Sequence, residues 1–246
     1  MNAICSRTRS LVLPRAELGE DQRAAMFALL VKHFEGVTRS QFDCDLEEKS
    51  HVILVDRDQR LVGFSTLLAY ETRHAGAPIS VVYSGDTIVA PEAWGTTALP
   101  RAWIAAVNEL RRQFSRGPYY WLLLTSGFRT YRFLPVFWRE FFPRFDAGES
   151  NGTRALLEHL AQERFGDQFD ASCGIVRFAR PQKLCPQLRG IPPERLADPH
   201  VKFFAARNPG HERGDELVCL TSLHHTNLTA AGRRMTGPHE PAPGLR

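Results

Sequence analysis

The stretch from Ile79 to Phe114 constrains the fold more than any other part of the chain, because it joins a strand to a long helix through a short polar turn. β-branched residues concentrate at 79–89, which favours a strand. Pro91 ends that strand, since proline has no N–H to donate to a neighbouring strand. From about Thr97 onward, apolar residues recur every three or four positions, the period of a helix with one buried face. These residues are Leu99, Trp103, Val107, Leu110 and Phe114.

The residues at the start of this helix, 94–98, form the first candidate binding site. The first N–H groups of a helix lack partners within the helix, and the positive end of the helix dipole lies beside them. Such a helix start favours an anion, and a strand that leads into it suggests a phosphate or pyrophosphate. The turn has neither the Gly-Lys-Ser/Thr of a P-loop nor the glycine spacing of a Rossmann fingerprint.

Residues 89–99, Val-Ala-Pro-Glu-Ala-Trp-Gly-Thr-Thr-Ala-Leu, resemble a motif of the GNAT superfamily of acyl-CoA-dependent N-acyltransferases. Members have a strand that ends in a Val-x-Pro-Glu-like turn, then Arg/Gln-x-x-Gly-x-Gly/Ala at the start of the helix that holds the CoA pyrophosphate. Gly95 matches the central glycine, whereas Glu92 replaces the usual Arg or Gln and Thr97 replaces the second small residue. The resemblance implies that the cofactor-binding residues are Ile88, Val89, Trp94, Gly95, Thr96, Thr97 and Ala98.

The composition is ordinary for a globular protein: 43% of the 246 residues are hydrophobic, 24% are charged, and the net charge is +4. This length supports one large domain, or one domain with an extension. No apolar run reaches the roughly 18 residues needed to cross a bilayer, and no signal peptide is evident, so we expect a cytoplasmic protein without membrane attachment. The mild charge permits an acidic partner without demanding one, and we expect no nucleic-acid partner. Five scattered cysteines without a Cys-x-x-Cys motif indicate free thiols and no metal site.

The order of the predicted elements supports the resemblance. In chain order we expect a strand at 7–15, helices at 20–34 and 38–49, strands at 51–55, 61–72 and 78–89, a helix at 97–114, a strand at 119–124 and a helical segment at 127–144. Three consecutive strands with short links form an antiparallel meander, and the next strand follows a βαβ-type crossover. The resemblance implies a mixed α/β (α+β) fold, in which a mostly antiparallel sheet is flanked by helices. Its two central parallel strands splay apart and admit the pantetheine arm.

The last third of the chain departs from this order and adds a C-terminal extension. We expect a helix at 153–164 and two hairpin strands at 174–179 and 216–223. The residues between these strands, 181–214, are rich in proline, which indicates an irregular insertion of the kind that forms a lid or a substrate wall. The predicted limits are a single GNAT-like domain at 1–234, with its core at about 7–180, and a flexible tail at 235–246.

Acyl transfer from a thioester to an amine requires an oxyanion site, a proton acceptor for the amine and a proton donor for the leaving thiolate. The resemblance places the oxyanion N–H near a bulge in the strand at 78–89, and Gly85 within that strand favours a bulge. Asp86 lies beside it and is the candidate general base. Alternatively, Asp86 binds a cationic substrate or hydrogen-bonds a neighbouring turn.

The proton donor is less well defined. GNAT members often use a tyrosine on the helix after the fifth strand, where this chain has Phe137 and Trp138. Tyr131, one to two turns earlier, is the substitute candidate, and its alternative role is packing. Further candidate bases, each of a type that is more often structural at a strand end, are His51, His224 and His225.

Glu92 leaves two acyl donors open, because a glutamate repels a pyrophosphate. In the first case Glu92 points to solvent and the N–H groups of 95–98 hold acyl-CoA. In the second case the donor is a phosphopantetheine thioester on an acyl carrier protein. An acidic carrier would dock on the arginines of the helix and the turn after it, which are Arg101, Arg111, Arg112 and Arg116.

Together these features predict an N-acyltransferase that moves an acyl group from a CoA or carrier-protein thioester to an amine by direct attack. A small-molecule amine is the expected acceptor, and its class stays open because acceptor pockets are built from variable loops. The alternative is a catalytically degenerate GNAT-like protein that binds a ligand or partner. A different α/β hydrolytic or transfer enzyme with a phosphate-binding helix start is a third hypothesis.

Overall fold

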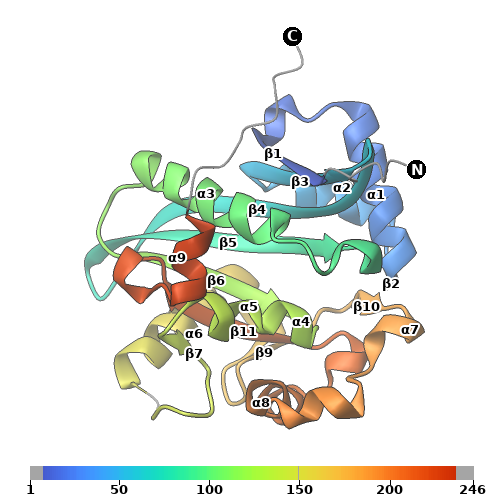
Figure 1. Cartoon of the computed structure of the whole chain (residues 1–246). Helices are drawn as coiled ribbons and strands as arrows, with labels where there is room; N and C mark the ends of the chain where they lie inside the picture. The colour runs from blue at the N-terminus through green and yellow to red at the C-terminus, as the bar shows by residue number, and fades with distance from the viewer. Residues whose placement is uncertain (1–7, 149, 237–246) are drawn as a thin grey trace.

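A computed structural model of the chain describes residues 8–148 and 150–236. At its centre is a mixed sheet in which β5 and β6 are parallel and the other pairs are antiparallel. The strand order is β1-β3-β4-β5-β6-β11-β9-β8, and the short β7 also pairs with β11. In Figure 1, β1, β3, β4 and β5 form the upper part of this sheet, and β6, β11 and β9 lie in its lower part. The predicted mixed, mostly antiparallel α/β fold is confirmed.

The predicted strands at 51–55, 61–72, 78–89, 119–124 and 216–223 are all present, whereas the one at 174–179 is reduced to two residues. The strands of the large sheet are β1 (Thr8–Pro14), β3 (His51–Arg57), β4 (Arg60–His74), β5 (Ala77–Val89), β6 (Tyr119–Thr125), β7 (Phe141–Phe142), β8 (Phe169–Asp170), β9 (Ile175–Val176) and β11 (Glu216–Ser222). A separate two-stranded sheet pairs β2 (Phe34–Glu35) with β10 (Lys183–Leu184).

β3, β4 and β5 form the predicted antiparallel meander, and β5 bulges against β4. On one side of the irregularity Ser65 pairs with Thr87, and on the other side Leu67 pairs with Ser84. Three steps along β5 therefore match two steps along β4, and the extra residue lies within 85–86. The bulge is where the glycine in this strand predicts it.

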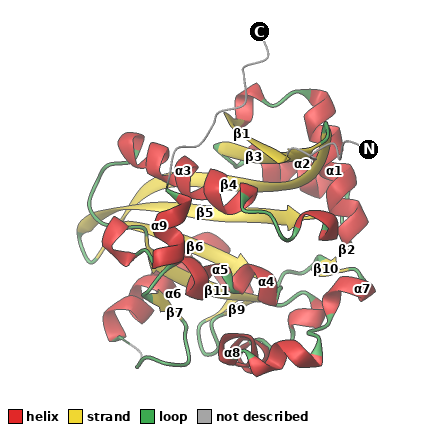
Figure 2. Cartoon of the chain, viewed as in Figure 1, coloured by secondary structure: helices red, strands yellow, loops and turns green. Residues whose placement is uncertain are grey.

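Helices cover both faces of the sheet (Figure 2). They are α1 (Glu20–His33), α2 (Arg39–Glu47), α3 (Ala98–Gln113), α4 (Phe128–Tyr131), α5 (Phe133–Phe137), α6 (Asn151–Phe165), α7 (Pro186–Arg189), α8 (Pro199–Arg207) and α9 (Ala230–Met235). Among the described residues, none of these helices combines the length and the apolar character that a bilayer crossing requires.

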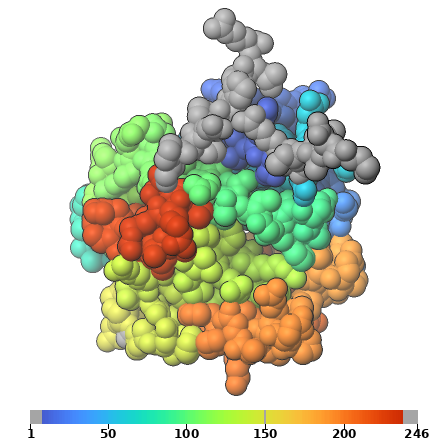
Figure 3. Space-filling model, viewed as in Figure 1, coloured from blue at the N-terminus to red at the C-terminus, as the bar shows by residue number. Residues whose placement is uncertain are grey.

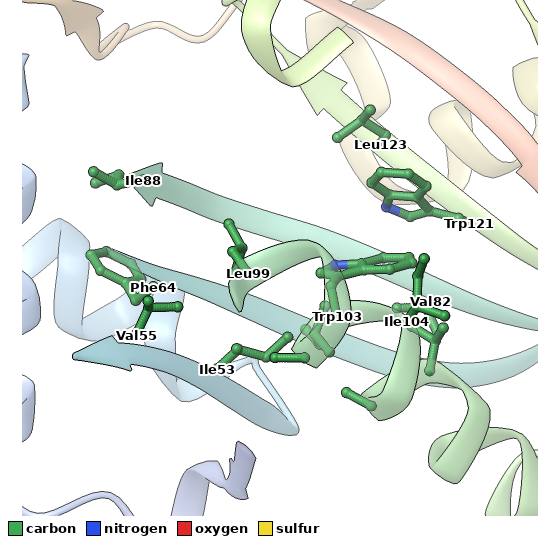
Figure 4. Packing of buried hydrophobic residues seen from close by; sticks show 14 of the residues in the cluster. Ile53, Val55, Phe64, Val82, Ile88, Leu99, Trp103, Ile104, Trp121 and Leu123 are labelled. Carbon is green, nitrogen blue, oxygen red and sulfur yellow. The ribbon is translucent and has the colours of Figure 1, made fainter. Parts of the chain in front are cut away.

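α3 and α6 lie on opposite faces of the sheet. Successive side chains of a strand point to opposite faces, and β5 shows this alternation. Val82 packs into the hydrophobic cluster that contains Trp103 of α3, whereas Val81 and Tyr83 pack with Leu160 of α6. Figure 4 shows the α3 side, where Trp103 lies beside Val82. The two faces are therefore covered by different clusters.

The predicted helical segment at 127–144 ends early, at Phe137. Trp138 has extended backbone and is buried, with its ring centre 4.9 Å from that of Trp121 and 5.8 Å from that of Trp103. The extended backbone also allows 141–142 to pair with β11. The helix therefore ends although the sequence continues its helical pattern, because burial of the indole and the strand pairing stabilise the extended backbone.

The insertion at 181–214 is more ordered than its prolines predict, because it contains α8. Pro199 occupies the first turn of that helix, where a missing N–H is tolerated, and the Asp198 carboxylate accepts a hydrogen bond from the His200 N–H. β10 fastens the insertion to β2, directly after α1. In Figure 3 the insertion (orange) lies beside the segment that follows β6 (yellow-green).

The predicted tail at 235–246 begins inside a helix. Met235 is the last residue of α9 and is buried. α9 packs against α5, and the Thr229 N–H before it donates to the Phe137 carbonyl at 3.0 Å. Residues 237–246, the rest of the predicted tail, lie outside the described residues.

Candidate active site

β5 and β6 part at the bulge. Their parallel pairing ends with Ser84 opposite Leu123, although β5 continues to Val89 and β6 to Thr125. The Trp121 indole donates a 2.8 Å hydrogen bond to the Ser84 hydroxyl, which holds the two strands together near their last pair. Beyond this point the arrows of β5 and β6 diverge (Figure 1). This is the splaying that the family resemblance implies.

A cavity of about 820 Å³ opens at this gap. On the α3 side its lining includes Thr97, Leu99 and Arg129. On the α6 side its lining includes Tyr83 and Phe165. Because residues from both faces of the sheet line it, the cavity passes between the two strands. Two molecules that enter from opposite faces would meet beside the bulge.

The start of α3 borders this cavity. The predicted cofactor-binding residues that line it are Ile88, Val89, Trp94, Thr96 and Thr97, whereas Gly95 and Ala98 do not. No described residue accepts a hydrogen bond from the N–H groups of 97–99. Glu92 is exposed, and Arg57 binds its backbone carbonyl at 2.8 Å. The helix start is therefore suited to an anion, and the unusual glutamate lies at the surface.

Trp94 and Arg129 connect the end of β5 to α4 on the α3 side. The Trp94 indole donates to the Val89 carbonyl at 2.7 Å, and the Arg129 guanidinium lies 4.0 Å from the centre of the Trp94 ring. Arg195 of the insertion lines the same cavity. Burial lowers the pKa of Arg129, and the charge of Arg195 lowers it further. Neither arginine has an acidic partner among the described residues, so the pair is suited to a phosphate.

Asp86 lines the cavity directly after the bulge glycine. No described residue hydrogen-bonds its carboxyl or forms an ion pair with it. Burial raises the pKa of Asp86 to about 6, against the opposing effect of the Lys49 ammonium. That ammonium lies 5.5 Å from the centre of the Tyr83 ring, on the α6 side. A carboxyl with a pKa near neutrality that faces a cavity is suited to accept a proton from an amine.

Glu216 is another carboxyl in this cavity, and the sequence alone did not identify it. It is the first residue of β11 and points to the α6 face, as Val218 two residues later does. Burial, together with the charges of Asp86 and Asp45, raises the pKa of Glu216 to about 8. No described residue pairs with this carboxyl. An acid at the start of an apolar strand was the one signal available from the sequence.

Tyr131 lies away from the cavity, which corrects the candidate proton donor. Its side chain is buried, and its hydroxyl donates to the Pro143 carbonyl at 2.9 Å. Its ring centre lies 5.5 Å from that of Phe204 in α8. Burial raises the pKa of Tyr131, and the hydroxyl is already engaged. The structure therefore assigns Tyr131 to packing, the alternative role.

The three candidate histidines, His51, His224 and His225, also lie outside the cavity lining. His224 and His225 are exposed and stack on one another with ring centres 4.4 Å apart. Within residues 8–148 and 150–236, no three His, Cys, Asp or Glu side chains converge in an arrangement that holds a metal ion.

The arginines proposed as a carrier-docking surface make bonds within the chain. Arg111 donates to the Gly117 carbonyl at 2.7 Å, and Arg112 pairs with Glu109 at 2.6 Å. These bonds leave less unpaired positive charge on α3 than the sequence suggests. They weaken the support for an acidic carrier at this surface.

No protein-family model matches the sequence, and no curated protein matches it. Solved structures with a similar arrangement include a probable N-acyltransferase of Enterococcus faecalis V583, with a TM-score of 0.42 and 17% identity over 55% of this chain and 33% of that chain. The GNAT family N-acetyltransferase YhbS of Escherichia coli, in complex with CoA, has a TM-score of 0.38 and 15% identity over 55% and 72%. Escherichia coli ElaA has a TM-score of 0.36 and 17% identity over 59% and 95%. The chain spans about a third of the length of the Enterococcus protein.

The fold assignment rests on the topology of the chain itself. The meander of β3, β4 and β5 leads through α3 to a parallel β6. β5 and β6 part beside a bulge, with the start of α3 at the same cavity. This is the arrangement that the motif at 89–99 implies, and the chain therefore has the GNAT fold, in a divergent form.

Proposed function

We propose that the chain is a divergent GNAT superfamily N-acyltransferase, which moves an acyl group from a pantetheine thioester to an amine. The observation that carries this proposal is the cavity between β5 and β6, because it joins the start of α3 to the unpaired carboxyl of Asp86. A thioester arm that enters from the α3 side would bring its carbonyl to the bulge. An amine that enters from the α6 side would reach the same point.

Acyl-CoA is the donor that we favour. Its pyrophosphate needs positive charge and N–H donors, and the α3 side offers the N–H groups of Thr97 and Leu99 together with Arg129 and Arg195. A carrier-bound phosphopantetheine, with a single phosphate, uses fewer of these groups. The arginines on α3 that would receive a carrier already have partners within the chain.

In the proposed reaction the Asp86 carboxylate takes a proton from the bound ammonium. The neutral amine attacks the thioester carbon, and an N–H of the bulge stabilises the oxyanion that forms. The C–N bond forms, the C–S bond breaks, and the thiolate takes the second nitrogen proton through water. The products are an amide and a free thiol, with the first proton left on Asp86.

Binding and turnover test this proposal in two steps. Calorimetry with acetyl-CoA, longer acyl-CoA, free CoA and an acyl carrier protein measures donor binding. Thiol release over a panel of amines measures transfer. Asp86→Asn should retain donor binding and lower kcat by about 100-fold or more, since general-base catalysis contributes roughly 10²–10⁴-fold. Asp58→Asn, an exposed substitution in the turn before β4, is the matched control and should leave both unchanged.

The outcomes separate the proposal from its rival. Binding of a CoA species without transfer to any amine would favour the degenerate ligand-binding protein. Failure to bind any CoA species or carrier would overturn the transferase. Undiminished turnover in Asp86→Asn would remove Asp86 as the proton acceptor.

A further inference from the structure

Lys49 is a buried cation at the cavity, and it has no role in the reaction proposed above. It lies two residues after the end of α2, and its residue is 7% exposed although its side chain reaches the cavity. The ammonium donates to the Asp45 carbonyl at 2.9 Å, which is its one hydrogen bond to the described residues. A lysine is rarely buried to this degree without a carboxylate nearby. We therefore expect the Lys49 ammonium to interact with a carboxylate in the cavity.

The bulge of β5 provides the space for this side chain. A Cβ on Gly85 would lie 2.7 Å from the Lys49 Cε and 3.4 Å from its Nζ. The lysine tip thus packs directly on the backbone of the residue before Asp86. Any side chain at the bulge would displace it.

The other charged or titratable groups around Asp86 come from three elements and from β5 itself. α2 and the turn after it contribute Asp45, Glu48 and Lys49; α6 contributes Arg164; β11 contributes Glu216; β5 contributes the Tyr83 hydroxyl. Arg164 is already paired with Glu48 at 2.7 Å. Lys49 is therefore the one cation of this group that has no ion pair within 4 Å among the described residues.

We propose that Lys49 is a positioning residue that keeps the Asp86 carboxyl ionised, so that it can accept the proton of the acceptor amine. This inference rests on the proposed transferase function and adds a residue to it. In a cavity with restricted solvent, a lone carboxyl favours its neutral form, and a second carboxyl such as Glu216 strengthens that preference. A buried ammonium against the same bulge opposes both effects. The effect is mutual, because burial and the charge of Arg164 lower the pKa of Lys49, and the Asp86 carboxylate opposes that shift.

The test measures the pKa of Asp86 directly, without reference to activity. The protein carries ¹³C-labelled aspartate, the Asp86 carboxyl signal is assigned by its loss in Asp86→Asn, and the signal is titrated in the unliganded protein. Lys49→Met should raise the pKa of Asp86 by about one unit or more, the size typical of a charge removed at close range. Lys49→Arg, which keeps the charge, should leave it near the wild-type value. Lys32→Met, an exposed lysine of α1, is the control and should change nothing.

The pH dependence of kcat/KM is the second readout. The acidic limb of the profile should move to higher pH in Lys49→Met by the same amount as the NMR titration. Raising the pH well above the shifted pKa should restore kcat/KM to within a few-fold of wild type. A role in holding the fold would not produce such a rescue. Lys49→Gln is the second variant if Lys49→Met fails to give the wild-type circular dichroism spectrum.

Two results would overturn the inference. An unchanged Asp86 titration in Lys49→Met and Lys49→Gln would show that the charges are not coupled. A shifted titration without recovery of kcat/KM at high pH would also overturn it, because Lys49 would then not act through the charge of Asp86. If the titration shifts as expected but no amine is acylated by the wild type, the Lys49–Asp86 coupling stands and the proposed function fails.

Discussion

Gly85 connects backbone geometry to chemistry at the scale of one residue. It occupies the bulge of β5, where the strand leaves its parallel partner, and Asp86 follows it into the cavity. The absence of a side chain gives the tip of Lys49 room against the strand. One glycine therefore permits both the bulge and the buried cation beside the candidate base.

Gly85→Ala should destabilise the fold by about 1–3 kcal/mol, the usual cost of forcing an added methyl into a packed site. The new Cβ would lie 2.7 Å from the Lys49 Cε and 2.7 Å from the Thr66 Oγ1, which is buried and hydrogen-bonds no residue that the structure describes. Urea unfolding measures the change. Gly95→Ala is the control, because a Cβ there meets no atom of the described residues within 4 Å, and its effect should stay within about 0.5 kcal/mol. Equal stabilities of the two variants would contradict the packing argument.

At the scale of elements, the helices and strands that can be predicted are those whose own residues show a helical or strand pattern. α3 follows from apolar residues at helical spacing, and β5 follows from its β-branched residues and the proline after it. The end of α5 was not predictable, because Trp138 leaves the helix to pack against indoles from two other elements. α8 was hidden by the prolines around it. Long-range packing overrode the local signal in both cases.

The residues of the candidate site likewise fall into two groups, those that the sequence predicts and those that only the structure identifies. Asp86 and the turn at 94–98 were found because a motif and a glycine within a strand mark them. No local sequence feature identifies Lys49 or Arg195, and Glu216 has only the weak signal of an acid at the start of an apolar strand. They reach the cavity from the turn after α2, the insertion and β11. Only the folded chain brings these segments together.

The insertion should contribute to donor binding through Arg195. Arg195→Ala should weaken CoA binding about tenfold, because a hydrogen bond to a charged group contributes roughly 1.5 kcal/mol. It should leave the affinity for pantetheine, which lacks phosphate, unchanged, and the loss should shrink as salt rises. Calorimetry at two ionic strengths measures both ligands. Arg112→Ala is the matched control, since Arg112 is exposed, paired with Glu109 and outside the cavity.

A CoA affinity for Arg195→Ala equal to that of the wild type would place the phosphates elsewhere and leave the insertion with a purely structural role. A parallel loss of pantetheine binding would show that the substitution disturbs the cavity rather than a phosphate contact.

At the scale of the whole molecule, a cavity through the sheet lowers the stability of the fold. It interrupts the pairing of β5 and β6, and it brings the carboxyls of Asp86 and Glu216 into the interior, where neither forms an ion pair with a described residue. Burial favours the neutral form of each, so the folded state binds protons that the unfolded state releases. The stability of the fold is therefore linked to the pH at which the site would work.

The sign of this linkage follows from the direction of the shifts. The pKa of Asp86 rises from 3.8 to about 6, and that of Glu216 rises from 4.5 to about 8. For a raised carboxyl pKa, the contribution to stability is fully present below the unfolded value and is lost as the pH rises through the folded value. The Glu216 contribution should therefore disappear between about pH 4.5 and 8, and that of Asp86 between about pH 3.8 and 6.

Glu216→Gln should remove the higher of these two windows, because the amide does not ionise. The difference in unfolding free energy between the variant and the wild type should change by about 1–2 kcal/mol in favour of the variant between pH 4.5 and 8, since one pKa unit corresponds to roughly 1.4 kcal/mol and cavity water screens the carboxylate. Urea titrations across this range measure it. Glu194→Gln, an exposed glutamate of the insertion, should show a flat difference. If the difference in unfolding free energy is also independent of pH for Glu216→Gln, the Glu216 carboxyl is solvated through the cavity. Asp86 is then the carboxyl that links stability to pH.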